Sequence, residues 1–206
     1  MRPIMPLTPP PVRSTVYCAS CQRAPQSYRD AAFELGALLA RRGVQVVFGG
    51  GAIGSMGALA DGVHAVGAHP IGVMPHFMRE LEWAHPQVQT FEWTHTMADR
   101  KARLLAGTDA LVALPGGCGT FEELMEAITL KRLGLYLNPI IIVNQDGFYD
   151  PLLALFERSV QDRFMDPRHL TMYSVVSSVD EVMDAIENAP AWSEENRHFS
   201  TQKDEA

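Results

Sequence analysis

The sequence predicts a single-domain α/β protein with a doubly wound parallel sheet and helices on both faces. Short apolar runs that suit strands alternate along the chain with longer segments of helical periodicity. Two glycine-rich loops, 49–57 and 115–119, each follow a predicted strand and precede a predicted helix. Because the carboxyl ends of parallel strands meet at one edge of a sheet, we expect both loops to line one cleft.

The strands are expected at residues 14–17, 44–48, 69–74, 88–93, 110–114, 139–143 and 175–176. The run 110–114 is apolar at every position, which is typical of a strand buried on both faces. Helices are expected at 27–42, from the loop 49–57 to about 66, and at 97–106, 120–133, 149–160 and 179–187. The first helix has an apolar face formed by Ala31, Leu35, Leu38 and Leu39. Gly43 ends that helix, and residues 75–85 are expected to form a loop.

Length and composition describe an ordinary globular domain. The chain has 206 residues, of which 47% are apolar and 20% are charged, enough for one substantial core. Residues 1–13 contain five prolines and are expected to form a disordered tail, followed by a domain at 14–189 and a polar tail at 190–206. A net charge of −7 disfavours a nucleic-acid partner, and no apolar run approaches the roughly 20 residues of a membrane span.

Cysteine and histidine usage favours neither a disulfide framework nor a metal site. Cys18 and Cys21 have the spacing of a redox pair, but they follow a strand and no second pair is present for zinc. The three cysteines therefore suit a reducing cytoplasm. Six histidines lack ligand spacing and are expected in loops or on the surface: His64, His69, His76, His85, His95 and His169. Ser20 and Ser55 have no adjacent acid–base pair, so a nucleophilic triad has little support.

The loop 115–119 has the properties of an anion site. It leads from a strand into a helix, whose first N–H groups and positive dipole end attract phosphate. Thr120 and Glu123 also have the spacing of a capping box, so Glu123 could serve only to cap the helix. A carboxylate beside a phosphate loop is electrostatically unfavourable unless the site uses it, which favours a functional role.

Gly49, Gly51 and Gly54 fit the dinucleotide fingerprint, but the rest of the pattern is missing. No carboxylate lies about 20 positions further on, and the loop follows the second strand rather than the first. We therefore expect close helix packing and approach to a mononucleotide. Arg100 and Lys101 lie near the start of the helix predicted at 97–106. They form either a solvated basic turn, or a site in which Arg100 lies at the mouth of the cleft and can bind a phosphate or a purine edge.

Several stretches together resemble the LOG ("lonely guy") family of cytokinin-activating phosphoribohydrolases. Residues 115–123, PGGCGTFEE, match its PGGxGTxxE signature, and 49–57, GGGAIGSMG, resemble its GGGxxGxMG loop. Residues 17–21 resemble the family's first-strand motif, and residues 100–101 match its Arg-Lys pair. Residues 146–149 resemble a later stretch of the family. The resemblance implies a Rossmann-like homodimer that needs no metal or organic cofactor. It would hydrolyse the N-glycosidic bond of adenosine 5′-monophosphates, N6-modified ones and in many members also AMP, releasing the free base (cytokinin or adenine) and ribose 5-phosphate.

The resemblance also assigns the site residues. It implies that Arg100 and Glu123 are catalytic and that Gly116, Gly117, Gly119 and Thr120 bind phosphate. Further substrate contacts are implied at Gly50, Gly51, Gly54, Glu82, Met97, Lys101, Glu122 and Thr129. The acidic contact falls in the loop 80–82 and is assigned to Glu82. Ala19 and Ala98 stand where the family often has Gly and His, which leaves open the choice between a prenylated and a plain adenine base.

Two other functions remain open at this point. A pyridoxal-phosphate decarboxylase would need a Schiff-base lysine, and of Lys101, Lys131 and Lys203 only Lys101 is placed near the cleft. A non-enzymatic nucleotide or cofactor carrier could use the same fold, because a fold does not determine an activity.

Overall fold

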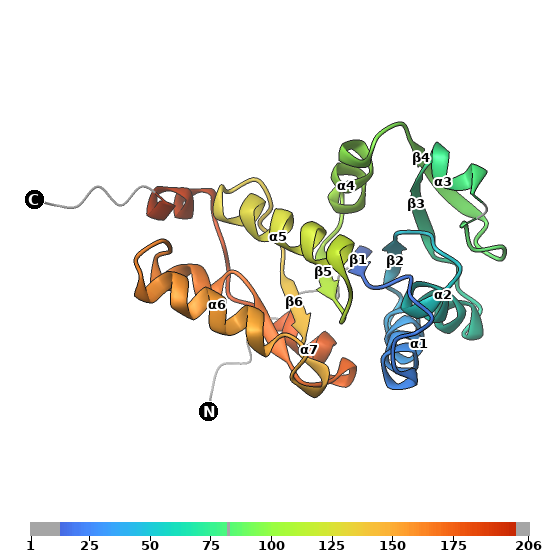
Figure 1. Cartoon of the computed structure of the whole chain (residues 1–206), viewed down its shortest axis with the longest axis horizontal. Helices are drawn as coiled ribbons and strands as arrows, with labels where there is room; N and C mark the ends of the chain where they lie inside the picture. The colour runs from blue at the N-terminus through green and yellow to red at the C-terminus, as the bar shows by residue number, and fades with distance from the viewer. Residues whose placement is uncertain (1–12, 82, 201–206) are drawn as a thin grey trace, which may run out of the picture.

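The computed structural model describes residues 13–81 and 83–200. In this part of the chain, one parallel sheet has the strand order β4-β3-β2-β1-β5-β6-β7, so the predicted fold class is confirmed (Figure 1). The strands are β1 (Arg13–Tyr17), β2 (Gln45–Phe48), β3 (Ile71–Pro75), β4 (Thr90–Thr94), β5 (Ala110–Ala113), β6 (Ile140–Val143) and β7 (Ser174–Val176).

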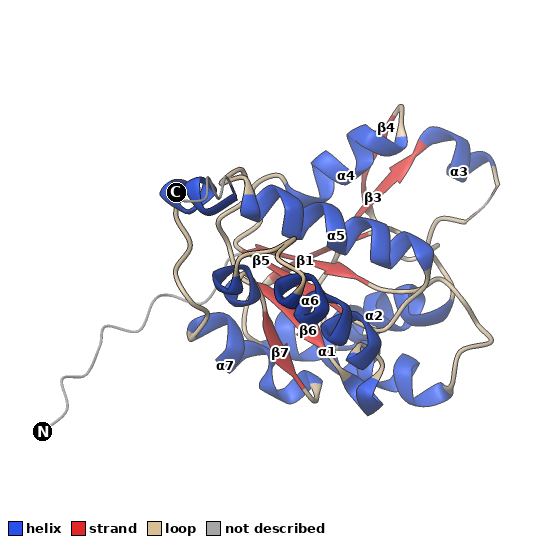
Figure 2. Ribbon diagram, turned by 60° about the vertical axis from the view of Figure 1, so that its left-hand side comes forward, coloured by secondary structure: helices blue, strands red, loops and turns tan. Residues whose placement is uncertain are grey.

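Helices cover both faces of the sheet. They are α1 (Gln26–Arg41), α2 (Gly54–Ala65), α3 (His76–Glu80), α4 (Met97–Leu105), α5 (Cys118–Arg132), α6 (Asp150–Gln161) and α7 (Val182–Glu187). Short 3-10 segments are η1 (Gln145–Gly147), η2 (Pro167–Thr171), η3 (Val179–Glu181) and η4 (Glu194–Ser200). Helices α1 and α2 lie on the opposite side of the sheet from α4 and α5 (Figure 2), which separates the buried apolar side chains into two clusters.

The direction of chain winding reverses beside β1. Val16 of β1 pairs with Phe48 of β2 on one side and with Val112 of β5 on the other. The chain therefore winds outward from β1 to β4, returns to β5, and winds outward the other way. In an open parallel sheet, ligands bind outside the carboxyl ends of the strands at such a reversal.

Glycines allow α1 and α2 to pack with their backbones close together. A Cβ atom on Gly62 would lie 2.0 Å from the carbonyl oxygen of Phe33, and one on Gly36 would lie 2.2 Å from that of Leu59. Neither carbonyl belongs to a flexible side chain, so larger residues at these positions would force the helices apart. The small residues of α2 therefore serve helix packing, as the sequence predicted.

Three sequence-based expectations about the elements are wrong. Residues 75–85 are not all loop, because α3 forms there. Helix α5 begins at Cys118 with Gly117 as its N-cap, so Thr120 lies inside the helix and is not a cap. The last helix is divided into η3 and α7. The remaining predicted boundaries agree with the structure to within two residues.

The capping box lies instead at the start of α4. The Asp99 N–H donates to Thr96 Oγ1 at 3.0 Å, and the Thr96 N–H donates to Asp99 Oδ2 at 3.2 Å. Since the Thr-x-x-acid pattern occurs at both sites, the difference lies in the preceding residues. Gly117 provides the turn before α5, and the helix starts two positions before Thr120 can act.

Some residues expected on the surface are buried. His169 is 1% exposed, and its Nδ1 accepts from the Asp166 N–H at 3.1 Å. His85 is 6% exposed, with Nε2 3.3 Å from Asp61 Oδ1. Trp192, placed by the sequence in a polar tail, is also buried and donates from Nε1 to the Lys131 carbonyl oxygen at 2.7 Å. The proposed domain limits themselves stay a prediction.

Candidate active site

A cavity of about 590 Å³ opens at the carboxyl edge of the sheet. It is lined by the segments that follow β1, β2, β4 and β5, and by residues at the end of β3 and after it. The loop after β2 contributes Gly49 and Gly51, and the loop after β5 contributes Gly117 and Gly119. The expectation that both glycine loops line one cleft is therefore confirmed.

The N-terminus of α5 faces this cavity. Gly117, Gly119 and Thr120 line it, and Gly117 is the N-cap residue. Because glycine has no side chain, Gly117 cannot cap the helix, and the first N–H groups of α5 are not covered by a side chain of the N-cap. A helix terminus of this kind favours a bound anion.

The three glycines of the loop after β5 have different roles in the structure. A Cβ atom on Gly116 would lie 2.2 Å from Thr120 Oγ1, so Gly116 is needed for the packing of Thr120. A Cβ atom on Gly117 or Gly119 would have no neighbour within 4 Å, and both glycines have ordinary φ values. Contacts within the chain therefore do not require glycine at these two positions. A ligand that binds close to the backbone would require it, because a side chain there would block its approach.

Arg100 of α4 extends under the cavity and is fixed at three points. Its Nε donates to the Val73 carbonyl oxygen at 3.0 Å and its Nη2 to the Gly49 carbonyl oxygen at 3.3 Å. Its Nη1 lies 3.3 Å from Glu123 Oε1. Arg100 is buried and lines the cavity, so it is not a solvated basic turn. A Cβ atom on Gly49 would lie 2.3 Å from Arg100 Nη2, so glycine at position 49 makes room for the guanidinium.

Glu123 is the carboxylate that meets Arg100 in the cavity. It lies on α5 and is 5% exposed. Burial raises the pKa of Glu123 to about 7, and the Arg100 charge opposes part of that rise. A buried carboxyl group with a pKa near neutrality, beside a guanidinium and a helix N-terminus, is suited to proton transfer or to stabilising positive charge.

This raised pKa predicts how stability depends on pH. The folded protein holds the Glu123 proton more tightly than the unfolded chain, so stability from this group is present at low pH and is lost as pH rises from 4.5 towards 7. The loss is about 3 kcal/mol in the free energy of unfolding. We expect Glu123→Gln to gain stability over the wild type between about pH 5 and pH 8 in urea titrations. An equal difference from the wild type at all pH values would contradict this assignment.

The predicted glycine contacts of the loop 49–57 divide between two roles. Gly51 lines the cavity. Gly50 has φ 78°, and a Cβ atom there would lie 2.6 Å from the Phe91 ring. Gly54 has φ 65°, and a Cβ atom there would lie 2.5 Å from the Cys21 backbone nitrogen. Gly50 and Gly54 therefore shape the loop, and neither lines this cavity.

The other predicted substrate contacts do not all lie at the cavity. Met97 lines the cavity. Lys101 pairs with Glu122 and with Glu126, at 2.8 Å for the latter, and neither Lys101 nor Glu122 lines the cavity. Thr129 is exposed further along α5, where its Oγ1 donates to the Met125 carbonyl oxygen at 2.8 Å. Glu82 lies outside the described residues, and the roles of all these residues in binding stay predictions.

Several residues that line the cavity were missed by sequence reasoning. The first strand is followed by Ser20 and Cys21, which line the cavity together with Cys18. The thiol of Cys18 is buried, and burial raises its pKa well above the ordinary range, which disfavours the thiolate of a redox pair. The other missed residues form an apolar wall, and their spacing in the sequence gave no signal of it: Ile53, Met56, Met74, Met78 and Trp83.

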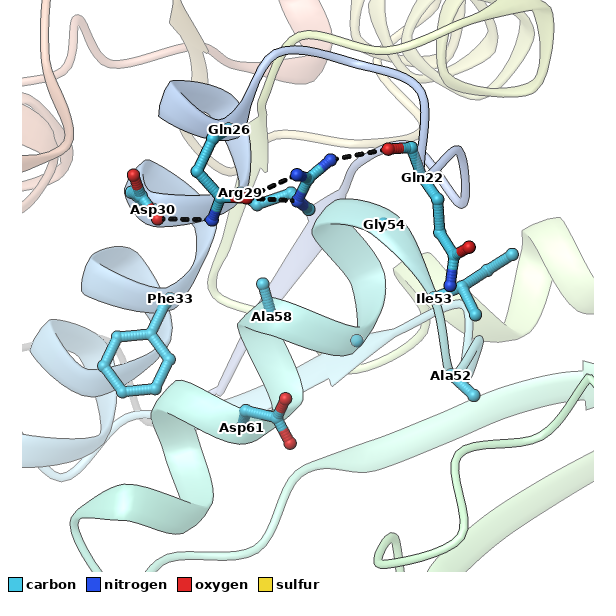
Figure 3. Close-up of a pocket in the computed structure, with 11 residues that line it drawn as sticks. Gln22, Gln26, Arg29, Asp30, Phe33, Ala52, Ile53, Gly54, Ala58 and Asp61 are labelled. Atoms are coloured by element: carbon cyan, nitrogen blue, oxygen red, sulfur yellow. Dashed lines mark hydrogen bonds between the residues drawn. The ribbon is translucent and has the colours of Figure 1, made fainter.

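A second cavity, of about 580 Å³, lies between α1 and α2 (Figure 3). Ala52 and Ile53 line both cavities. Arg29 is the cation that lines the second cavity, but it donates to the Gln22 carbonyl oxygen at 2.7 Å and to the Gln26 side chain. These bonds tie Arg29 to its own helix and the preceding loop, so the first cavity is the stronger candidate for chemistry.

The fold and the site together define a Rossmann-like α/β protein with a glycine-lined helix N-terminus beside a buried Arg–Glu pair. Residues 56–186 match the family model described as "Possible lysine decarboxylase", and the chain belongs to this family, which here includes the LOG proteins. Cytokinin riboside 5′-monophosphate phosphoribohydrolase LOG of Oryza sativa subsp. japonica is 38% identical over 193 residues, covering 90% of this chain and 80% of that protein. The relative LOG3 of Arabidopsis thaliana is 40% identical over 155 residues, covering 75% and 72%. The resemblance drawn from the sequence is confirmed.

Solved structures share the fold. The molybdenum cofactor carrier protein of Chlamydomonas reinhardtii superposes with a TM-score of 0.65 over 86% of this chain and 96% of that one, at 20% identity. The molybdenum cofactor binding protein of Rippkaea orientalis gives a TM-score of 0.64 at the same identity, over 86% and 95%. At this identity the likeness shows the fold alone.

Proposed function

We propose that this protein hydrolyses the N-glycosidic bond of adenosine 5′-monophosphates, including N6-modified ones, and releases the free base and ribose 5-phosphate. The observation that carries the proposal is the buried Arg100–Glu123 pair in the cavity that the N-terminus of α5 faces. The relatives named as cytokinin riboside 5′-monophosphate phosphoribohydrolases support the same reaction.

The phosphate would bind at the N-terminus of α5, against Gly117, Gly119 and Thr120. Binding at this point fixes the sugar, so that interactions away from the reacting atoms contribute to the rate. The sugar would then lie over Glu123, which belongs to the first turns of the same helix.

Glu123 would act on the reacting carbon. Cleavage of the bond from C1′ to the base leaves the electron pair on the base and builds positive charge on the ribose ring. The Glu123 carboxylate offsets that charge and accepts one proton from the water that attacks C1′, whose hydroxyl stays on C1′. The proton then passes from Glu123 to the departing base, which leaves Glu123 ionised again. A pKa of about 7 allows Glu123 to exchange a proton near neutrality.

Arg100 would hold the site in its working arrangement. Its bonds to two main-chain carbonyl groups fix the guanidinium, which keeps a positive charge 3.3 Å from Glu123. That charge favours the ionised carboxylate in a buried environment, and the remaining N–H groups can contact the substrate.

The positions of the lysines do not support Schiff-base chemistry. Lys101 is held by Glu122 and Glu126, and the buried Lys131 donates to the Asn138 carbonyl oxygen at 2.8 Å. Of the lysines in residues 13–81 and 83–200, neither lines the cavity. The family description as a possible lysine decarboxylase therefore finds no suitable lysine in the described site.

We also propose that the protein works as a homodimer in the cytoplasm. Phe121 and Met125 of α5 are each 39% exposed close to the catalytic pair, and a second copy could cover them. The described cysteines are free thiols, as in a reducing compartment. Among the described helices, none is long and apolar enough to span a bilayer.

Product analysis tests the reaction. We expect incubation with AMP or with isopentenyladenosine monophosphate to give free base and ribose 5-phosphate in equal amounts, both quantified by chromatography. Release of nucleoside and inorganic phosphate would show a phosphatase. Nucleotide binding without any product would show a carrier.

A further inference from the structure

The entrance to the loop 115–119 is fixed at Leu114. Strand β5 ends at Ala113, and Leu114 is the last residue before the loop. Its N–H donates to the Tyr17 carbonyl oxygen at 2.9 Å, which ties this residue to the end of β1. Because Leu114 is 1% exposed, its carbonyl oxygen also needs a hydrogen-bond donor from the protein.

Tyr149 supplies that donor. Its hydroxyl donates to the Leu114 carbonyl oxygen at 2.7 Å, and the residue is 1% exposed. Burial and, to a smaller extent, the Cys18 side chain raise the pKa of Tyr149 well above its ordinary value, so the hydroxyl keeps its proton and remains a donor. Tyr149 does not line the cavity, so it acts on the loop and not on a bound molecule.

The Tyr149 ring also contacts the far end of the loop. Its centroid lies 6.4 Å from that of Phe121, in an edge-to-face arrangement that is favourable for aromatic pairs. Phe121 lies near the start of α5, directly after Thr120, and its N–H donates to the Gly117 carbonyl oxygen at 3.0 Å. One side chain therefore fixes the residue that enters the loop and contacts the helix that leaves it.

The turn after β6 determines where Tyr149 lies. Strand β6 is the neighbour of β5 in the sheet, so the segments that follow the two strands meet at the same edge. Within this turn Asp146 and Gly147 have φ values of 54° and 71°, in the left-handed region, and the chain reverses there. The Tyr149 N–H then donates to Asn144 Oδ1 at 2.6 Å, which closes the turn. The stretch 146–149, for which the proposed reaction gives no role, therefore serves to place the Tyr149 side chain.

We propose that Tyr149 is a positioning residue, which holds the loop 115–119 in the shape that binds the phosphate of the substrate. This inference rests on the proposed function, in which the phosphate lies at the N-terminus of α5. A Cβ atom on Gly117 or Gly119 would meet no atom within 4 Å, so the middle of the loop is open and its shape depends on its two ends. Without the Tyr149 hydroxyl, the Leu114 carbonyl oxygen would be buried and unpaired. The loop would then shift to pair it, away from the arrangement in which its N–H groups converge on phosphate.

The test uses Tyr149→Phe, which keeps the ring and removes the hydroxyl. We expect the Kd of ribose 5-phosphate to rise about tenfold, the scale set by one buried acceptor left unpaired, and the Kd of adenine to stay at the wild-type value. Isothermal titration calorimetry measures both constants without turnover. For AMP, KM should rise by a similar factor, with kcat changed much less.

The matched control is Tyr136→Phe, which removes the hydroxyl of another buried tyrosine. Tyr136 is 7% exposed and belongs to the same apolar cluster, beyond the C-terminal end of α5. This control should bind ribose 5-phosphate and adenine as the wild type does. Since each variant loses a single oxygen atom from the core, both are expected to fold, which far-UV circular dichroism checks.

The outcomes separate this role from the proposed reaction. Wild-type affinity for ribose 5-phosphate in Tyr149→Phe would overturn the positioning role. Equal losses of affinity for ribose 5-phosphate and for adenine would overturn it as well, because Tyr149 would then support the whole cavity. If the wild type cleaves no nucleotide while Tyr149→Phe loses affinity for ribose 5-phosphate alone, the proposed function fails and the role of Tyr149 in phosphate binding stands.

Discussion

Replacement of Glu123 by glutamine is expected to lower the rate of base release from AMP by about 10²- to 10⁴-fold. Glutamine has the same shape and can still accept from Arg100, but it neither carries negative charge nor takes a proton from water. Since the phosphate site at the N-terminus of α5 is untouched, nucleotide affinity should remain close to that of the wild type. Single-turnover chromatography and equilibrium titration measure the two quantities separately.

The control for this variant lies on the same helix. Glu126 pairs with Lys101 and does not line the cavity, so Glu126→Gln should retain most of the activity. If Glu123→Gln releases base at the wild-type rate, the role assigned to Glu123 is wrong. If it loses nucleotide binding as well, Glu123 serves binding and not the chemical step.

Replacement of Arg100 by lysine should have the second-largest effect, a loss of about 10²- to 10³-fold in kcat/KM. The guanidinium reaches Val73, Gly49 and Glu123 at the same time, and a single ammonium group cannot reproduce that geometry. When Glu123 is less firmly paired, its pKa should rise further. The part of the pH–rate profile in which activity rises as Glu123 loses its proton should therefore move to higher pH. A pH–rate profile measures this shift.

Lysine is preferred to alanine here because removal of the charge would leave Glu123 buried without its partner and could unfold the protein. Arg103→Lys is the matched control, since Arg103 lies on the same helix and pairs with Glu92 at the surface. A variant Arg100→Lys with reduced activity but an unshifted pH profile would show that Arg100 contacts the substrate without controlling the ionisation of Glu123.

The sequence predicted the order of the elements and the position of the cleft because both depend on local signals. Apolar runs that end at glycine loops mark strands that lead into helices, and parallel strands bring those loops to one edge. The capping box was placed at the wrong helix for the same reason, because a local pattern at Thr120 and Glu123 also occurs at Thr96 and Asp99. Only the position of Gly117 as the N-cap distinguishes them.

The apolar wall of the cavity and the function of Gly49 could not be predicted from the sequence, because both depend on tertiary contacts. Met56, Met78 and Met97 come from three separate helices and share no spacing in the sequence. Gly49 looked like part of a dinucleotide fingerprint, but its lack of a side chain makes room for Arg100, which lies 51 residues further along the chain. Contacts of this kind become visible only when the fold is known.

The most direct test of the central claim is a crystal structure of the Glu123→Gln variant with AMP bound. The phosphate should lie within hydrogen-bonding distance of the N–H groups of Gly119 and Thr120, with C1′ of the ribose beside residue 123. A nucleotide bound in the cavity between α1 and α2, or with its phosphate on the methionine side, would contradict the account.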